Sequence, residues 1–305
     1  MASEQGTRCG YIALIGAPNA GKSTLLNRLV GRKLAIVTPK VQTTRARLLG
    51  IAVEGEAQLI YVDTPGIFDP RRRLDRAMVA AAWAGAADAD VTVLLVDAAR
   101  AAQRGLDPDT ERIIERLKET GRGAVLALNK VDLVHREKLL GLADTLFRRG
   151  VFGHVFMVSA LTGDGTDDLK RHLALSVPPG PWLFPEDQLS DAQERWLAAE
   201  VTREQVFLQL HDELPYAATV ETESWAERRD GSVRIEQVIF VRRETQRAIV
   251  LGENGRRIKA IGARARAELE RALERRVHLF LFVKVRENWI DDPERFAAMG
   301  LDYSA

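Results

Sequence analysis

Short runs of apolar, often β-branched residues alternate with amphipathic stretches through the first part of the 305-residue chain. The apolar runs are typical of buried strands, and the stretches between them carry hydrophobic residues at helical spacing. The runs lie at residues 11–16, 58–63, 91–97, 124–129 and 155–160. Strands that are each followed by a helix predict an α/β fold, with a mostly parallel sheet and helices on both faces. Residues 48–63 contain two strands around a Glu-Gly-Glu turn, which predicts one antiparallel edge hairpin.

The pattern changes after residues 176–190, which carry four of the eleven prolines. Proline removes backbone donors and forbids regular structure, so we expect a domain boundary here, with domains at 1–180 and 181–305. The second domain then reads α-β-β-α-α-β, an α+β arrangement that ends in the apolar strand at 277–285. We interpret that strand most simply as core.

Composition adds limits rather than a function. The chain is 46% hydrophobic and 29% charged, with a formal net charge of +1, which is typical of a soluble globular protein and excludes a disordered one. No apolar run is long enough to span a bilayer, and the first ten residues contain no apolar signal segment. A single cysteine suits a reducing compartment, so we expect a cytoplasmic protein.

The sequence "GAPNAGKST" at 16–24 fits the phosphate-binding pattern G-x-x-x-x-G-K-[ST], directly after a strand and at the start of a helix. The two glycines let backbone N–H groups surround phosphates, and the helix N-terminus adds positive potential. Lys22 is expected to reach the β- and γ-phosphates, and the Ser23 hydroxyl to bind Mg²⁺. The expected contacts are Gly16, Ala17, Pro18, Asn19, Ala20, Gly21, Lys22, Ser23 and Thr24.

A second strand ends in "DTPG", which supplies Asp63, Thr64, Pro65 and Gly66. Asp63 is predicted to approach the Mg²⁺ shell, and the Gly66 N–H to sense the γ-phosphate. A threonine from the loop at 38–48 is expected to complete the shell with GTP and to leave it after hydrolysis. We favour Thr44 over Thr43, and the choice between them stays open. Catalysis is assigned to Lys22, Thr44 and Gly66, and the metal to Ser23, Thr44 and Asp63.

Two further strand ends predict the base. "NKVD" provides Asn129, Lys130 and Asp132, and "SAL" provides Ser159, Ala160 and Leu161. The Asp132 carboxylate can accept hydrogen bonds from guanine N1–H and its amino group, a donor pair that adenine lacks. An unpaired carboxylate with ATP costs on the order of a few kcal/mol, which is real discrimination. The predicted ligands are therefore GTP or GDP, with Mg²⁺.

Taken together, these motifs resemble the TrmE–Era–EngA group of translational GTPases. That group carries an apolar residue where Ras-like proteins place a water-orienting glutamine, and here Ile67 follows "DTPG". The resemblance implies slow intrinsic hydrolysis and K⁺ held by Asn19. A polar loop residue without a metal role is the alternative for Asn19.

Residues 249–262, "IVLGENGRRIKAIG", hold a G-x-x-G turn inside a basic region. Between Arg242 and Arg276 there are eleven Arg or Lys against five Glu. Such a turn lets a polyanionic backbone approach closely, and the region resembles a type II KH domain, which clamps single-stranded nucleic acid. The expected RNA contacts are Gly252, Glu253, Asn254, Gly255, Arg256, Arg257 and Lys259. Four apolar residues are expected in the core or the base groove: Ile249, Val250, Ile258 and Ile261. Glu253 departs from the basic residue that the family often has there, so it either faces solvent or lowers RNA affinity.

A G domain followed by one KH domain resembles the Era family of bacterial GTPases over nearly the whole chain. That resemblance implies a monomer that binds the 3′ end of 16S rRNA and assists assembly of the small (30S) ribosomal subunit. The alternative is a signalling GTPase whose basic region docks peripherally on the anionic inner membrane. A double-G-domain GTPase is excluded because the chain contains one P-loop.

Overall fold

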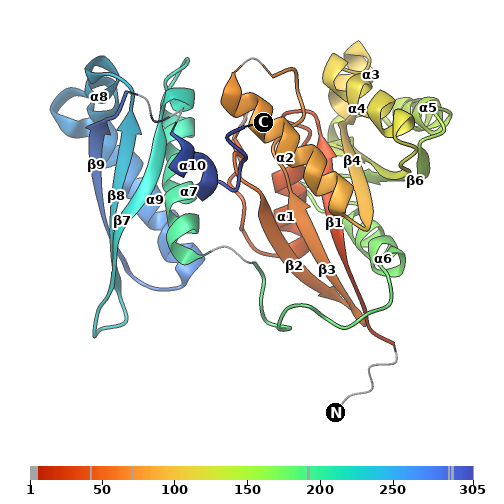
Figure 1. Cartoon of the computed structure of the whole chain (residues 1–305), viewed down its shortest axis with the longest axis horizontal. Coiled ribbons are helices and arrows are strands. Elements are labelled where there is room, and N and C mark those ends of the chain that lie inside the picture. The colour runs from red at the N-terminus through yellow and green to blue at the C-terminus, as the bar shows by residue number, and fades with distance from the viewer. Residues whose placement is uncertain are drawn as a thin grey trace. The chain divides into compact units, whose positions relative to one another are not determined.

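The computed structural model describes residues 6–304 except 42, 71, 191–192, 288 and 290–291. The chain divides into two compact units (Figure 1). The first unit is made of residues 1–35, 44–191 and 299–305, and the second of residues 36–43 and 192–298.

A six-stranded sheet in the order β2-β3-β1-β4-β5-β6 forms the first unit (Figure 1). The strands are β1 (Arg8–Gly16), β2 (Leu48–Glu54), β3 (Ala57–Asp63), β4 (Val91–Asp97), β5 (Ala124–Asn129) and β6 (Phe152–Val158). Only β2 runs antiparallel to its neighbour, and the remaining pairs are parallel. The predicted mostly parallel sheet with one edge hairpin is therefore confirmed.

The first unit's helices are α1 (Lys22–Val30), α2 (Arg73–Asp88), α3 (Ala98–Arg104), α4 (Pro108–Glu119), α5 (Arg136–Phe147) and α6 (Thr166–Ser176), with a 3₁₀ turn η1 (Val131–Leu133). Helices α2 to α5 share one apolar cluster with the central strands, where Ile15, Leu94 and Leu126 are buried. Parallel strands end at one edge of a sheet, so the loops after β1, β3, β5 and β6 open on the same side.

The proline-rich segment, residues 176–190, groups with the first unit. Ile51 donates its N–H to the Leu189 carbonyl at 2.8 Å, and the Gln58 amide donates to the Phe184 carbonyl at 2.7 Å. Trp182 donates its indole N–H to the Glu56 carbonyl at 3.1 Å. Prolines remove donors but leave carbonyl acceptors, so this segment can cover the edge hairpin without forming a strand.

The second unit follows the predicted α-β-β-α-α-β order and adds a short last helix (Figure 1). Its helices are α7 (Glu194–Gln209), α8 (Glu244–Leu251), α9 (Arg256–Leu273) and α10 (Pro293–Ala298), with 3₁₀ turns η2 (Pro215–Ala217) and η3 (Glu253–Gly255). Its strands are β7 (Thr219–Glu227), β8 (Val233–Val241) and β9 (Val277–Val285). Strand β8 is antiparallel to β7 and parallel to β9. Helices α7 and α9 bury the central strand, in which Ile235 and Ile239 are fully covered.

Two short segments group with the unit that is distant in sequence. Residues 36–43 belong to the second unit, and residues 299–304 to the first. In the latter segment, Leu301 is buried and the Tyr303 ring centroid lies 4.6 Å from the Arg73 guanidinium at the start of α2. Among the described residues, no helix has the length and apolar character needed to cross a bilayer.

Candidate functional site

The phosphate loop joins β1 to α1. Gly21 caps α1 with φ 101°, and Asn19 lies in the left-handed region with φ 63°. Lys22 is buried, and its Nζ donates to the carbonyls of Gly16 at 3.0 Å and Ala17 at 3.1 Å. Burial lowers the pKa of Lys22 to about 8, and the nearby Asp63 carboxylate only partly offsets this effect. A bound phosphate would supply an anionic partner, which favours the charged form of Lys22.

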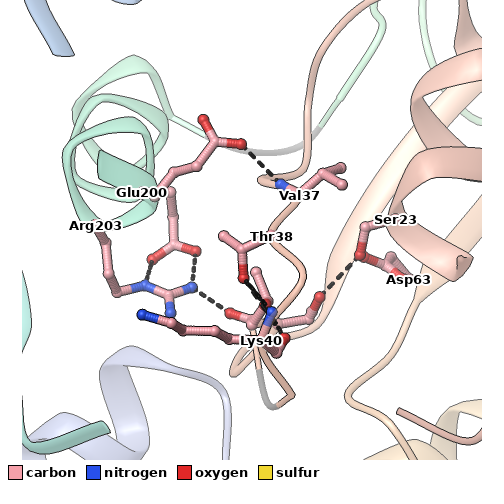
Figure 2. A network of polar contacts seen from close by, with 10 residues as sticks. Ser23, Val37, Thr38, Lys40, Asp63, Glu200 and Arg203 are labelled. Carbon is pink, nitrogen blue, oxygen red and sulfur yellow. Dashed lines mark hydrogen bonds and ion pairs between the residues drawn. The ribbon is translucent and has the colours of Figure 1, made fainter. Parts of the chain in front are cut away.

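Three oxygen-bearing side chains converge beside Lys22. The Ser23 hydroxyl donates to Asp63 Oδ2 at 2.7 Å and lies 2.9 Å from the Thr44 hydroxyl (Figure 2). Asp63 is fully buried, and burial raises its pKa to about 6. Its Oδ1 has no hydrogen-bond partner in the described part of the chain. Mg²⁺ prefers hard oxygen ligands, so the hydroxyls and the carboxylate fit this ion, and the orphaned oxygen offers it a further contact.

The structure brings Thr44, not Thr43, to this cluster. The Thr43 hydroxyl instead donates to the Lys40 carbonyl at 2.8 Å and lies 2.7 Å from the Thr38 hydroxyl. This geometry favours Thr44 as the metal ligand.

The "DTPG" loop runs beside the phosphate loop. Thr64 donates its hydroxyl to the Leu14 carbonyl at 3.0 Å, and Pro65 is buried. A Cβ on Gly66 would lie 3.1 Å from the Pro18 backbone, so glycine permits this approach. Ile67 is 2% exposed and packs in the core cluster, where it presents no polar atom to a water molecule.

Asn129 connects the phosphate loop to the predicted base loop. Its amide donates to the Ala20 carbonyl at 2.8 Å and accepts from the Ala160 N–H at 2.9 Å. Asp132 is exposed on η1, and Leu161 is 74% exposed. Ser159 is fully buried under this loop. The loops after β1, β5 and β6 therefore meet, with the Asp132 carboxylate accessible to a base.

Two residues at this end escaped sequence reasoning. The first is Asp97, which ends β4 just as Asp63 and Asn129 end their strands, so its position could have indicated it. Its carboxylate forms an ion pair with Lys130 at 2.6 Å. Arg28 donates to the carbonyls of Ala160 at 3.4 Å and Leu161 at 2.5 Å. An arginine on a helix gives no comparable signal.

In the second unit, the G-x-x-G turn separates α8 from α9. Gly252 has φ 68°, Asn254 φ 51° and Gly255 φ 72°, and Gly255 caps α9. Arg257 donates to the Ile249 carbonyl at 2.9 Å. Glu253 forms an ion pair with Arg256 in which both side chains are exposed. Glu253 thus does face solvent, but it neutralises one of the expected phosphate-binding cations.

A groove of about 320 Å³ opens between α9 and β9. Its lining comprises Ile258, Lys259, Gly262, Ala263, Arg266, Leu279, Phe280 and Leu281. Of the four predicted apolar residues, Val250 and Ile261 are core, Ile258 lines the groove, and Ile249 is 47% exposed.

Strand β9 is only partly core, which corrects the sequence interpretation. Val277 and Val283 are buried, but Phe280 and Phe282 are 43% and 49% exposed. Val277 and Val283 lie on the face of β9 that packs in the core, while Phe280 and Phe282 alternate with them and therefore lie on the opposite face.

Comparison with known families assigns both units. Residues 11–130 match the family described as 50S ribosome-binding GTPase, and residues 213–290 match the KH domain. GTPase Era of Rhizobium meliloti is 61% identical over 297 residues, spanning 97% of this chain and 94% of the relative. GTPase Era of Afipia carboxidovorans is 60% identical over 297 residues, spanning 97% and 95%.

Two solved structures cover 96% of this chain and 99% of their own, at 36% identity and a TM-score of 0.89. One is an Aquifex aeolicus Era variant bound to GDP·AlF₄⁻. The other is Era in complex with MgGDPNP and nucleotides 1506–1542 of 16S ribosomal RNA.

Proposed function

Since the chain belongs to the Era family of GTPases, we propose that its KH domain binds the single-stranded 3′ end of 16S rRNA and that it acts in assembly of the 30S subunit. We place this assembly function in the cytoplasm. The related Era structure that contains 16S rRNA supports the choice of ligand.

The groove between α9 and β9 is the observation that carries the proposal. It combines an apolar floor, including Ile258 and Leu281, with the basic side chains of Lys259 and Arg266. KH domains place unstacked bases in such a groove, while the G-x-x-G turn holds the backbone of about four nucleotides. Gly255 precedes the groove residues at the N-terminus of α9, where backbone N–H groups favour a phosphate.

Hydrolysis belongs to the first unit. Lys22 and the N-terminus of α1 would bind the phosphates, and Ser23, Thr44 and Asp63 would hold the ion. Mg²⁺ supplies charge stabilisation to the β- and γ-phosphate oxygens when it is bound. Ile67 is buried and cannot orient water by hydrogen bonding, so we expect the slow intrinsic hydrolysis that the family resemblance implies.

A fluorescent single-stranded RNA that matches the 16S 3′ end tests the proposal. Its affinity is measured for protein loaded with GDP or with a non-hydrolysable GTP analogue, against a random oligonucleotide of equal length. The Gly255→Asp variant should weaken binding at least about tenfold, because its carboxylate meets the RNA backbone. A Cβ at this position lies 4.0 Å from Ile258 and Lys259, so the change has room.

Gly231→Asp is the matched control. Gly231 also has a positive φ, of 79°, has nothing within 4 Å of an added Cβ, and lies in the turn between β7 and β8. The control variant introduces the same backbone strain and the same negative charge at a position outside the groove. Equal affinity for matched and random RNA contradicts the proposal. Binding to anionic vesicles that persists in that case favours the peripheral membrane function.

A further inference from the structure

Three residues in the segment 36–43 of the second unit form hydrogen bonds with helix α7 or with Leu210, which follows it (Figure 2). The Val37 N–H donates to Glu204 Oε1 at 2.8 Å. The Thr43 carbonyl accepts from Arg203 Nη2 at 2.5 Å. Between them, Lys40 Nζ donates to the carbonyls of Phe207 and Leu210. Both ends of the segment and its middle are therefore attached to one helix.

Lys40 serves the end of that helix. The last carbonyls of an α-helix lack intrahelical partners and carry partial negative charge, so a cation there is stabilising. Burial lowers the pKa of Lys40, while the nearby Asp212 carboxylate opposes this shift. The loop lysine thus caps α7 at its C-terminus.

Among the charged side chains that join residues 36–43 to helix α7, Arg203 is the most buried, at 2% exposure. Its guanidinium donates to both carboxylate oxygens of Glu200 and lies 5.2 Å from the Phe207 ring centroid. Nη1 is buried without a hydrogen-bond partner among the residues described. A buried ion pair stabilises a fold no better than well-packed apolar side chains of similar size. What an apolar residue cannot supply is the hydrogen bond to the Thr43 carbonyl.

One peptide bond connects this carbonyl to the metal ligand. The Thr43 carbonyl carbon is bonded to the nitrogen of Thr44, whose hydroxyl lies 2.9 Å from Ser23 in the first unit. A planar peptide leaves few torsions between the carbonyl that Arg203 fixes and the Thr44 side chain. The position of the hydroxyl therefore depends on the anchor on α7.

We propose that Arg203 is a positioning residue of the GTPase site, which holds Thr44 ready to bind Mg²⁺ when the nucleotide carries a γ-phosphate. Helix α7 holds this loop through Arg203 and Glu204, and Lys40 adds hydrogen bonds to the carbonyls at the C-terminus of the helix. The inference rests on GTP hydrolysis in the first unit and does not require that the KH domain bind RNA.

Arg203→Met tests the inference in the full-length protein without RNA. Fluorescent GDP and a fluorescent non-hydrolysable GTP analogue are titrated across a range of Mg²⁺ concentrations. Affinity for the analogue should fall roughly tenfold, as expected when a charge-assisted hydrogen bond is lost. Affinity for GDP should change by less than about twofold, since the loop threonine binds the ion only with the triphosphate. Half-maximal hydrolysis should need more Mg²⁺. Equal losses for both nucleotides, or no loss, overturn the proposal.

Two further variants keep the test decisive. Lys40→Met removes the hydrogen bonds from the loop to the carbonyls of Phe207 and Leu210 without opening the core. It should reproduce the selective loss of analogue affinity. If Arg203→Met does not fold, unchanged analogue affinity in Lys40→Met overturns the proposal. Arg203→Lys retains a positively charged hydrogen-bond donor group and should restore part of the affinity for the analogue.

Arg195→Met is the matched control on the same helix. Arg195 donates to the carbonyls of Thr222 and Glu223 on β7, so its loss should leave both nucleotide affinities unchanged. A selective loss in this control assigns the effect to general weakening of α7 and overturns the positioning role.

Discussion

Gly21 and Asn129 lie so close that a Cβ on Gly21 would stand 2.1 Å from the Asn129 side-chain nitrogen. That nitrogen donates to the Ala20 carbonyl at 2.8 Å. The side-chain amide of Asn129 therefore connects the phosphate loop to the base loop. Glycine is required at position 21 both by this approach and by its φ of 101°.

Gly21→Ala should reduce affinity for GDP and for a GTP analogue by at least about a hundredfold, because the methyl group displaces Asn129 and strains the loop. Titration with fluorescent nucleotides measures both affinities. Gly121→Ala is the control, because Gly121 has φ 63° but nothing within 4 Å of an added Cβ. It should bind nucleotide normally. Normal nucleotide affinity in Gly21→Ala would show that the contact with Asn129 is dispensable.

The buried carboxyl of Asp63 predicts a pH-dependent cost to stability. Burial raises its pKa to about 6, above the ordinary value of 3.8, so the folded chain binds this proton more readily than the unfolded chain. Stability from this group is therefore present at low pH and is lost as the pH rises from about 4 to about 6. Without Mg²⁺ or nucleotide, Asp63→Asn should be more stable than the parent at pH 7, and this advantage should shrink towards pH 4.

Urea unfolding of both proteins between pH 4 and pH 8 measures the difference in the free energy of unfolding. Adding Mg²⁺ and GTP analogue at pH 7 should reverse the order, because only the carboxylate binds the ion well. A stability difference that does not change with pH would contradict the ionisation of Asp63 as its cause.

The nucleotide end of the site was predictable because its residues lie in short motifs at strand ends. The run from Gly16 to Thr24 contains its own turn, helix start and lysine, and parallel strands bring Asp63 and Asn129 to the same edge. Local sequence is enough for such a site, since the sheet supplies the remaining geometry.

The features that sequence reasoning missed depend on which surfaces other segments cover. Strand β9 has an unbroken apolar run at 279–283, and that pattern cannot say that Phe280 and Phe282 remain exposed on the second face. Residues 36–43 carry no signal for α7, because their partners Arg203 and Glu204 are distant in sequence. The hydrogen bonds to carbonyls of the proline-rich segment were not predicted either, because the argument from proline considered only the donors that proline lacks.

Arg28 supplies a prediction for the base loop. Its guanidinium binds the carbonyls of Ala160 and Leu161, and these contacts hold the loop whose N–H groups are expected to read guanine O6. Arg28→Met should weaken affinity for both GDP and GTP by roughly tenfold, the loss expected for charge-assisted hydrogen bonds. Arg104→Met, on the last turn of α3, is the control and should leave affinity unchanged. Equal affinities in the two variants would remove Arg28 from the base site.

Glu253→Lys should strengthen binding of single-stranded RNA. Glu253 pairs with Arg256 at the surface, so the change frees one cation and adds another beside the G-x-x-G turn. Each additional phosphate contact steepens the salt dependence of binding by about 0.7 in the slope of log K against log salt. Affinity measured at several salt concentrations should therefore show both tighter binding and a steeper slope.

Glu244→Lys is the comparison for this last change, because Glu244 forms the same kind of exposed pair, with Arg247 on α8, outside the turn. It makes the same change in net charge, so any shared gain in affinity measures long-range attraction alone. The excess in Glu253→Lys then reports contact at the turn. Equal gains in the two variants, or weaker binding in Glu253→Lys, would place the RNA backbone elsewhere on the KH domain.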